Sequence, residues 1–364
     1  LVVSGNNVNV NVTPAAINPV VSVTGNGNVS ISAPSAATVN VSNALDVGTT
    51  NVTAAGALTL NKVSVAGSAN FTGTSINDTL ERIFVYNAVA FNATTGNVTI
   101  NKGKHSFGPV SVSAPLGEAV VYEDAATQLN VINTPKLTLR SPSYVFQTAG
   151  TGAIGSTNST ITATGNITLG AAANAAGTYI LSGKDITLAN TGASVLTLTG
   201  GNISVASGGA ITLNNVNASG TLGLTAGTSI TQAADTKVNA IGAVSLVGSG
   251  ITLNNAGNTF GALSIDVGLA GSAAITEQTT LNLASLRAGT ATFNSNANVI
   301  TTGVLPVAAD TFSIVVGGDF VPTANFKTTN PITVLATGNV DLSALSSATN
   351  LNSKSPSVIA KGYK

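Results

Sequence analysis

One short phrase recurs through the middle of the chain and narrows the folds open to it. Each copy consists of an aliphatic residue, a small polar residue and a second aliphatic residue. Counted on its first aliphatic residue, the phrase occurs at Ile167, Ile186, Ile203, Leu222, Val244, Leu263 and Leu281. The shortest step is from Ile186 to Ile203 and the longest from Leu222 to Val244, so the period is roughly 19 residues. A second phrase, at Ile211, Ile230 and Ile251, is out of phase with the first, so each repeat holds more than one strand.

The alternation within each phrase gives the repeat a physical meaning. A period of two places the aliphatic side chains on one face of a strand and Thr, Ser or Asn on the other. One short strand cannot bury its apolar face alone, but a strand that returns after roughly 19 residues can pair in parallel with its counterpart, about 4.8 Å away. Such repeats are too short for a strand and a crossover helix and are typical of a β-solenoid. We expect Ile203 to face the core, and Thr168 and Thr187 to face outward.

The coils are not equally regular along the chain. Residues 1–75 show the alternation, with prolines placed at corners because proline cannot donate to a strand ladder. Residues 151–345 form the main solenoid, and residues 346–364 lose the pattern, as a tail or linker would. The predicted fold is therefore all-β, a parallel β-solenoid with a coil of about 19 residues.

Residues 76–150 differ from the rest in composition. They hold ten of the 26 charged residues, the single histidine and three of the five tyrosines. The stretch Asn77–Phe84 has an Asn or Asp that could cap a short helix, whereas Val98-Thr99-Ile100 still indicates a strand. We interpret this segment as an irregular insert or subdomain that interrupts the coils.

Several phrases resemble a known family of repeats. They are Gly165-Asn166-Ile167-Thr168-Leu169, Ala210-Ile211-Thr212-Leu213-Asn214-Asn215, Gly250-Ile251-Thr252-Leu253-Asn254-Asn255 and Asn258-Thr259-Phe260-Gly261-Ala262-Leu263-Ser264-Ile265. They are similar to the filamentous-haemagglutinin-type repeat region of bacterial adhesins exported by two-partner secretion. The resemblance covers residues 156 to about 300, is weaker over the first 70 and does not extend to 76–150. It implies a right-handed parallel β-helix, secreted or on the cell surface, that serves as a stiff stalk for adhesive regions.

Composition narrows the possible partners and cofactors. Charged residues make up 7% of the 364 and the net charge is zero, which argues against nucleic acid and anionic lipid as partners. No apolar run is long enough for a membrane-spanning helix. The chain has no cysteine, so disulfides and thiolate metal sites are excluded, and no phosphate loop or calcium-binding nonapeptide repeat is present. We expect no cofactor and no metal.

The carboxylates are the first candidates for catalysis. Glu118, Glu123 and Asp124 form the one local acidic group, which could be a solvated loop, a sugar or peptide contact, or a catalytic pair of the kind found in glycosidases. His105 lies close to two lysines, which disfavour both an added proton and a bound cation, and no serine has the nucleophile-elbow sequence. We therefore expect no enzymatic activity.

Three hypotheses for function follow. The first is a non-enzymatic extracellular rod, a stalk or fibre segment of a bacterial surface adhesin, whose partner is a glycan or protein on a host or neighbouring cell. The second is a subunit that self-associates into a filament, sheath or surface layer, and the third is a polysaccharide-active enzyme. Because tyrosines with flanking polar groups suit sugars and proteins, we expect contacts within 76–150. The candidate contact residues are Tyr86, Lys102, Lys104, His105, Glu118, Tyr122, Glu123, Asp124 and Tyr144.

Overall fold

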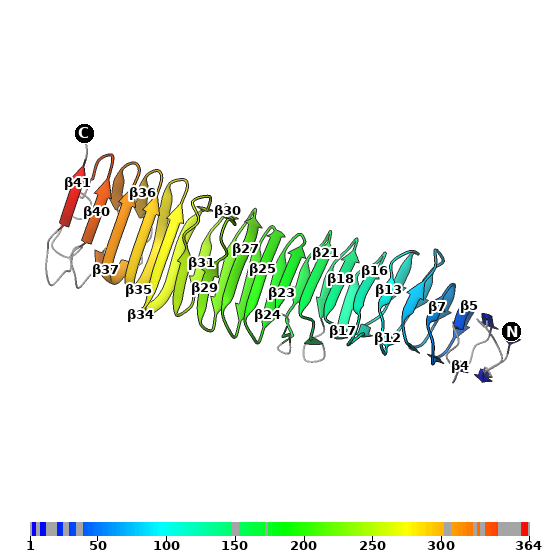
Figure 1. The fold of residues 1–364 in the computed structure, drawn as a ribbon. Helices are drawn as coiled ribbons and strands as arrows, with labels where there is room; N and C mark the ends of the chain where they lie inside the picture. Colours follow the sequence, from blue (N-terminus) through cyan, green and yellow to red (C-terminus); the bar gives the residue numbers. More distant parts are fainter. Residues whose placement is uncertain are drawn as a thin grey trace. The chain divides into compact units, whose positions relative to one another are not determined.

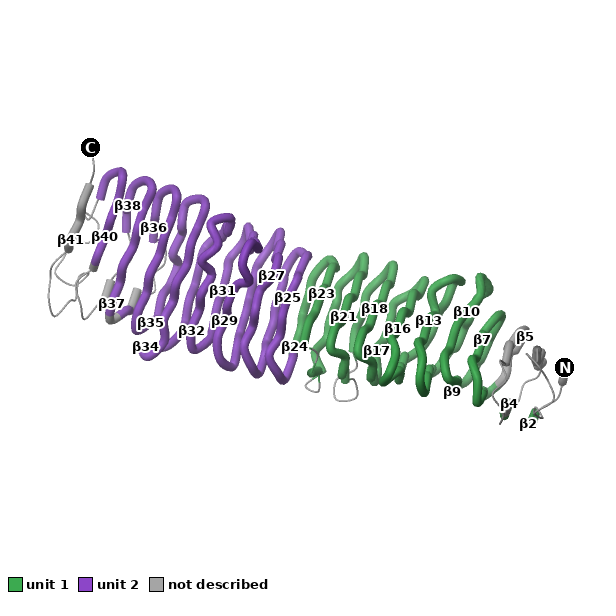
Figure 2. Tube along the Cα trace, viewed as in Figure 1, with its two compact units in different colours: residues 1–189 green, residues 190–364 purple. Residues whose placement is uncertain are grey.

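The computed structural model describes most of the chain as strands. The described residues are 2–4, 8–11, 20–24, 29–33, 39–147, 153–171, 174–175, 177–301, 307–322, 326–327, 332–340 and 358–362. Within these ranges there is no helix, and hence none long and apolar enough to cross a membrane. The chain divides into two compact units, residues 1–189 and 190–364 (Figure 2). Each is described by itself below.

The first unit is built from parallel strands. They are β1 (Val2–Ser4), β2 (Val8–Asn11), β3 (Val20–Thr24), β4 (Val29–Ala33), β5 (Val39–Val47), β6 (Thr50–Ala54), β7 (Leu58–Leu60), β8 (Val63–Val65), β9 (Ala69–Gly73), β10 (Ile76–Asp78), β11 (Ile83–Val85), β12 (Val89–Ala93), β13 (Val98–Ile100), β14 (His105–Phe107), β15 (Val110–Ser113), β16 (Glu118–Tyr122), β17 (Thr127–Asn133), β18 (Lys136–Ser141), β19 (Val145–Gln147), β20 (Ala153–Ile154), β21 (Asn158–Ala163), β22 (Ile167–Leu169), β23 (Thr178–Ser182) and β24 (Ile186–Asn190).

The coils of the first unit follow one another in a stack (Figure 1). From β6 to β16 each coil has three short strands. β6, β9, β12 and β15 pair in one row, β7, β10, β13 and β16 in a second, and β8, β11 and β14 in a third. Partner residues lie about one period apart in the sequence, as where Leu58 pairs with Ile76 and Ile76 in turn with Val98. The unit is therefore a parallel β-solenoid, as the alternation and period predict.

The apolar faces of these strands fill the interior of the coils. Phe71 and Phe91 are both fully buried, occupy partner positions in β9 and β12, and stack with ring centroids 5.7 Å apart. Phe107 meets Phe91 edge to face at 5.5 Å. Burial of each such ring contributes about 1.5–3 kcal/mol, so the three rings couple two neighbouring coils and two strands of the second coil.

Residues 76–147 belong to the same stack. β10 pairs with β7 before it and β13 after it, and β16 pairs with β13 and β18, all in parallel. The predicted helix at Asn77–Phe84 is wrong, because these residues contribute to β10 and β11. The irregular insert is not seen either: most of the charged side chains lie at outward positions and corners, and Asp78 and Glu123 are held inside the coils without any break in the stack.

The second unit repeats this architecture. Its strands are β25 (Ser194–Gly200), β26 (Ile203–Ser207), β27 (Ile211–Ala218), β28 (Leu222–Ala226), β29 (Ser229–Gln232), β30 (Val238–Ala240), β31 (Val244–Val247), β32 (Gly250–Leu253), β33 (Thr259–Phe260), β34 (Ala262–Glu277), β35 (Leu281–Ser295), β36 (Val299–Thr301), β37 (Val307–Val316), β38 (Phe320–Pro322), β39 (Phe326–Lys327), β40 (Ile332–Ala336) and β41 (Val358–Gly362). Every pairing among them is parallel within the described residues.

The phase of the alternation is as expected. Ile203 is buried and pairs with buried Leu222, whereas Thr168 and Thr187 in the first unit are exposed. Corners require small residues, because a Cβ on Gly227 would lie 2.0 Å from the carbonyl oxygen of Gly208 in the preceding coil. The alternation thus sets the faces, and glycine permits the tight corners between them.

The tail predicted for residues 346–364 lies at the end of the second unit. Of residues 346–364, positions 346–357 and 363–364 lie outside the described residues. The remaining five form β41, which pairs in parallel with β40, with Ile332 opposite Val358. A strand therefore lies where the sequence predicts an irregular tail.

Candidate functional site

A buried hydrogen-bonded pair of polar side chains lies at a corner of the first unit. Asp78 ends β10 at an inward position that Leu60 fills in the preceding coil, and His105 begins β14 opposite Ile83. The Oδ2 atom of Asp78 lies 2.7 Å from Nε2 of His105, and neither side chain has any exposed surface. Two polar residues thus replace aliphatic ones inside the coils.

Backbone groups fix the roles of both side chains. The Ile83 N–H donates to Nδ1 of His105 at 3.2 Å, which assigns the proton to Nε2, the atom that faces Oδ2 of Asp78. The Gly103 N–H lies 3.2 Å from both Nε2 and Oδ2, and with this tautomer it donates to the carboxylate. Oδ2 of Asp78 also accepts the Lys102 N–H at 2.7 Å and the Gly103 N–H at 3.2 Å. Burial alone would raise the pKa of Asp78, but these hydrogen bonds, led by that of His105, hold it below its usual value. The pair joins β10 to the turn before β14.

Glu123 occupies the interior of the next coil. Its neighbour Asp124 donates a backbone N–H to the His105 carbonyl oxygen at 2.8 Å, which places Glu123 one coil beyond the histidine. The carboxyl group is buried and neither oxygen has a hydrogen-bond partner among the described residues. Burial raises the pKa of Glu123 to about 8, although the nearby Thr127 hydroxyl and Phe107 backbone act in the opposite direction. At pH 7 this side chain is mostly the neutral acid.

A groove beside Glu123 gathers several of the predicted contact residues. Tyr122, Glu123 and Asp124 line it together with Arg140 from the following coil, and it encloses about 420 Å³. Arg140 and Asp124 are exposed at its edge, while the Glu123 oxygens are covered. The groove offers outside ligands an exposed carboxylate, a guanidinium and a phenol.

The other predicted contact residues do not converge on this groove. Tyr86 and Tyr144 are 71% and 51% exposed at separate positions. Glu118 forms an exposed ion pair with Lys136 at 3.0 Å, an interaction worth little in water. Lys102 and Lys104 are exposed beside β14, and His105 is interior. The residues that composition groups together are therefore spread by the coils over different faces.

The described residues contain no cluster suited to a metal ion. No group of three or more His, Cys, Asp or Glu side chains is found among them. His105 has both ring nitrogens within hydrogen-bond distance of neighbouring groups, and its buried ring has no open coordination position.

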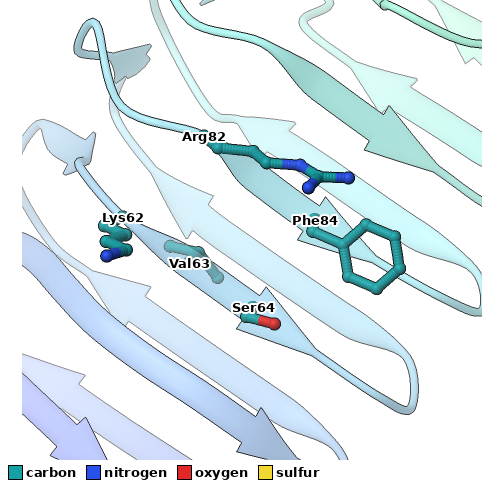
Figure 3. Close-up of a pocket in the computed structure, with 5 residues that line it drawn as sticks. All are labelled: Lys62, Val63, Ser64, Arg82 and Phe84. Carbon is teal, nitrogen blue, oxygen red and sulfur yellow. The ribbon is translucent and has the colours of Figure 1, made fainter.

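A row of cations is a feature that the sequence analysis misses. Lys62, Arg82 and Lys104 each precede a strand of the third row, and Lys62 and Arg82 border a hollow of about 270 Å³ that Phe84 also lines (Figure 3). The guanidinium carbon of Arg82 lies 5.1 Å from the centre of the Phe84 ring. The return of a basic residue after about one coil, twice in succession, is the signal that could have revealed the row.

Two Gln–Asn side-chain pairs have a structural role rather than a catalytic one. Gln147 and Asn174 in the first unit exchange hydrogen bonds at 2.8 and 2.9 Å, and Gln232 and Asn258 in the second do so at 2.7 and 2.9 Å. The asparagine Oδ1 also accepts a backbone N–H in both pairs. Asn174 accepts the N–H of Ile154 at 3.1 Å, and Asn258 accepts that of Val238 at 2.9 Å. Each pair clamps a corner between two coils.

We expect Asn258→Ala to destabilise the protein by about 1–3 kcal/mol, because it leaves the buried Val238 N–H without a partner and removes two of the hydrogen bonds of the Gln232 amide. Chemical denaturation followed by circular dichroism measures the loss. Gln232→Leu should cost less in the Asn258→Ala background than alone, since the two amides satisfy each other. Asn254→Ala, at an exposed position, is the matched control. Additive effects of Gln232→Leu and Asn258→Ala would contradict the clamp.

Comparison with known proteins gives one finding. The sequence model of a family described as repeats of unknown function (DUF5649) matches residues 47–113 and 200–266. The first match lies in the first unit and the second in the second unit. No curated protein and no solved structure matches the chain.

Proposed function

We propose that this chain is a non-enzymatic structural scaffold, a stalk or fibre segment of a bacterial surface adhesin that acts outside the cell. The observation that carries the proposal is the in-register stacking of coils with polar ladders on their outer faces. Asn92 donates to Asn70 of the preceding coil at 2.6 Å, and Asn239 donates to Asn217 at 2.9 Å. These ladders tie each coil to the next along the direction of stacking.

Such a construction suits a spacer. In a solenoid the stability is a sum of coil terms and neighbour contacts, so length is gained by adding coils rather than by enlarging one core. The buried polar groups described above bind neighbouring coils to one another, which is a structural task. The fold requires no disulfide, since the chain has no cysteine. The resemblance to adhesin repeats supports the surface location and a glycan or protein on another cell as the partner.

Hydrodynamics tests the scaffold role. Sedimentation velocity over a wide range of concentrations is expected to give a 35.7 kDa monomer with a frictional ratio above that of a compact globular protein. Negative-stain microscopy should show discrete particles. Filaments that lengthen with concentration would favour a self-assembling subunit instead.

Digestion assays test the non-enzymatic part of the proposal. Incubation of the chain with a panel of polysaccharides is expected to leave their length distributions unchanged. Shortened polysaccharide whose production is abolished by alanine at Glu118, Glu123 or Asp124 would overturn it in favour of the enzyme.

A further inference from the structure

The outer face of the third strand row carries three cations in register. Val63 pairs with Ile83, and Ile83 with His105, so the preceding residues Lys62, Arg82 and Lys104 follow one another from coil to coil. All three side chains are exposed. Adjacent parallel strands are about 4.8 Å apart, which sets the spacing of the row along the stack. We call these three residues the basic row.

The basic row is electrostatically unfavourable on its own. Like charges at neighbouring positions of adjacent strands destabilise a sheet. Where the structure describes the chain, the ion pairs are those of Lys136 with Glu118 and Arg287 with Asp266, and neither involves the basic row. Glu81 is exposed next to Arg82 but lies in no ion pair. An anionic partner with regularly spaced charges would relieve this repulsion.

Aromatic side chains lie beside the cations. Phe84 follows Arg82 by two positions on the same face of β11, and its ring receives the guanidinium at 5.1 Å, which holds the Arg82 side chain over the sheet. Lys62, Ser64 and Phe84 line the hollow of about 270 Å³ at this point (Figure 3). Tyr86, 71% exposed, continues the line of outward residues beyond the strand. The exposed ring of Tyr86, with polar neighbours, suits the apolar face of a sugar ring.

We infer that the basic row binds a linear polysaccharide with one carboxylate per sugar, a polyuronate, running along the stack. The row presents a cation about every 4.8 Å along the stack, and a polymer with a carboxylate on each sugar presents negative charges at similarly regular intervals. Arg82 offers a planar fork that matches a carboxylate, and the lysines supply point charges. The choice of an extracellular ligand rests on the proposed adhesive role; the site itself rests on the register of the row.

A nucleic acid fits the row less well. Phosphate-driven binding needs many cations, whereas the row has three within a chain of 13 basic and 13 acidic residues. A polymer with sulfates at irregular positions along each disaccharide would not repeat its charge once per coil. Charge of one kind on every sugar is the pattern that the row matches.

Binding to polygalacturonate tests the proposal. The full chain is immobilised and titrated with polygalacturonate in buffer with EDTA, which prevents calcium-bridged gels. The comparison polymers are the methyl-esterified form of the same backbone, heparin and single-stranded DNA. The triple variant Lys62→Gln, Arg82→Gln and Lys104→Gln should bind polygalacturonate at least about tenfold more weakly than the original chain. The matched control removes the same charge at exposed Lys136, Lys184 and Lys237 and should bind as the original does.

The remaining outcomes are decisive either way. Loss of binding to the esterified polymer and weakening by salt support a carboxylate site. Equal affinity of the two triple variants, or no binding by the original chain, overturns the proposal. Tighter binding of heparin or DNA than of polygalacturonate overturns the choice of ligand. Binding accompanied by shortening of the polymer would leave the site standing and overturn the non-enzymatic function, so the two failures are distinguishable.

Discussion

Ile203→Asp is expected to lower the free energy of unfolding by several kcal/mol. Ile203 is 1% exposed in β26, opposite buried Leu222 of the next coil. Aspartate at this position would lie in an aliphatic interior with no cation to pair with, and an unpaired buried carboxylate is among the costliest substitutions in proteins. Because coil stability depends on neighbour contacts, we expect the loss to spread to the adjacent coils.

A series at neighbouring positions separates the charge from the loss of packing. Ser204→Asp adds the same charge on the exposed face of the same strand and should change stability by less than about 0.5 kcal/mol. Ile203→Val removes one methylene and should cost about 0.5–1.5 kcal/mol. Urea denaturation followed by circular dichroism gives all three values. A larger loss from Ser204→Asp than from Ile203→Asp would show that the assigned faces are reversed.

Much of the architecture could be predicted because it depends on alternation and period. Where an aliphatic residue stands at every second position, as in Ile167-Thr168-Leu169, one face must be buried. Because the phrase returns after roughly 19 residues, parallel stacking of successive coils is the way to bury that face, and Ile167 pairs in parallel with Ile186. These two features specify the strands, their pairing partners and the inward residues. They hold in both units.

The interpretation of residues 76–150 as an insert is wrong for a physical reason. Composition marks where charges occur along the chain, but a coil tolerates almost any side chain at its outward positions and corners. Charge and tyrosine therefore accumulate without disturbing the parallel pairing of β10 to β19. The interior place of His105 is not evident from the sequence, because its distant partner Asp78 occupies an inward position where the alternation predicts an aliphatic residue.

The return of a basic residue after about one coil indicates a row, but only an exact length for each coil places the three side chains in line. Ile76 pairs with Leu58 on one side and with Val98 on the other, and the second step is longer than the first. An average period therefore places a side chain on the wrong coil position after one or two turns. The corner residues that absorb the difference carry no strong pattern. The sequence therefore predicts which residues of a strand face inward and which face outward. The structure is needed to show which outward side chains lie next to one another on successive coils.

The stability of the protein should fall as pH rises from about 4.5 to 8, chiefly through Glu123. In the unfolded chain this group has a pKa near 4.5, and burial raises it to about 8 in the folded protein. Between these values the folded protein binds more protons than the unfolded chain, so the free energy of unfolding decreases with pH. The difference in pKa corresponds to about 5 kcal/mol at full ionisation.

Glu123→Gln isolates this contribution. Glutamine keeps the shape of the neutral acid without a titrating proton, so the variant and the original chain should have similar stability at pH 4. At pH 8.5 the variant should be more stable by several kcal/mol. Urea denaturation at pH 4, 6 and 8.5 gives the comparison, and Glu118→Gln, at a half-exposed position, is the control that should leave the profile unchanged.

Other buried carboxyl groups do not contribute to the pH-dependent difference in stability between the original chain and Glu123→Gln. The lowered pKa of Asp78 contributes stability above the usual pKa of 3.8, and that stability is lost only as pH falls further. Burial raises the pKa of Glu277 as well, despite hydrogen bonds from Thr279 and Phe260, so it adds a fall of the same sign to both the original chain and the variant. Subtracting the two profiles cancels both groups. A difference that stays flat from pH 4 to 8.5 would mean that Glu123 is ionised in the folded protein and has a partner for its charge.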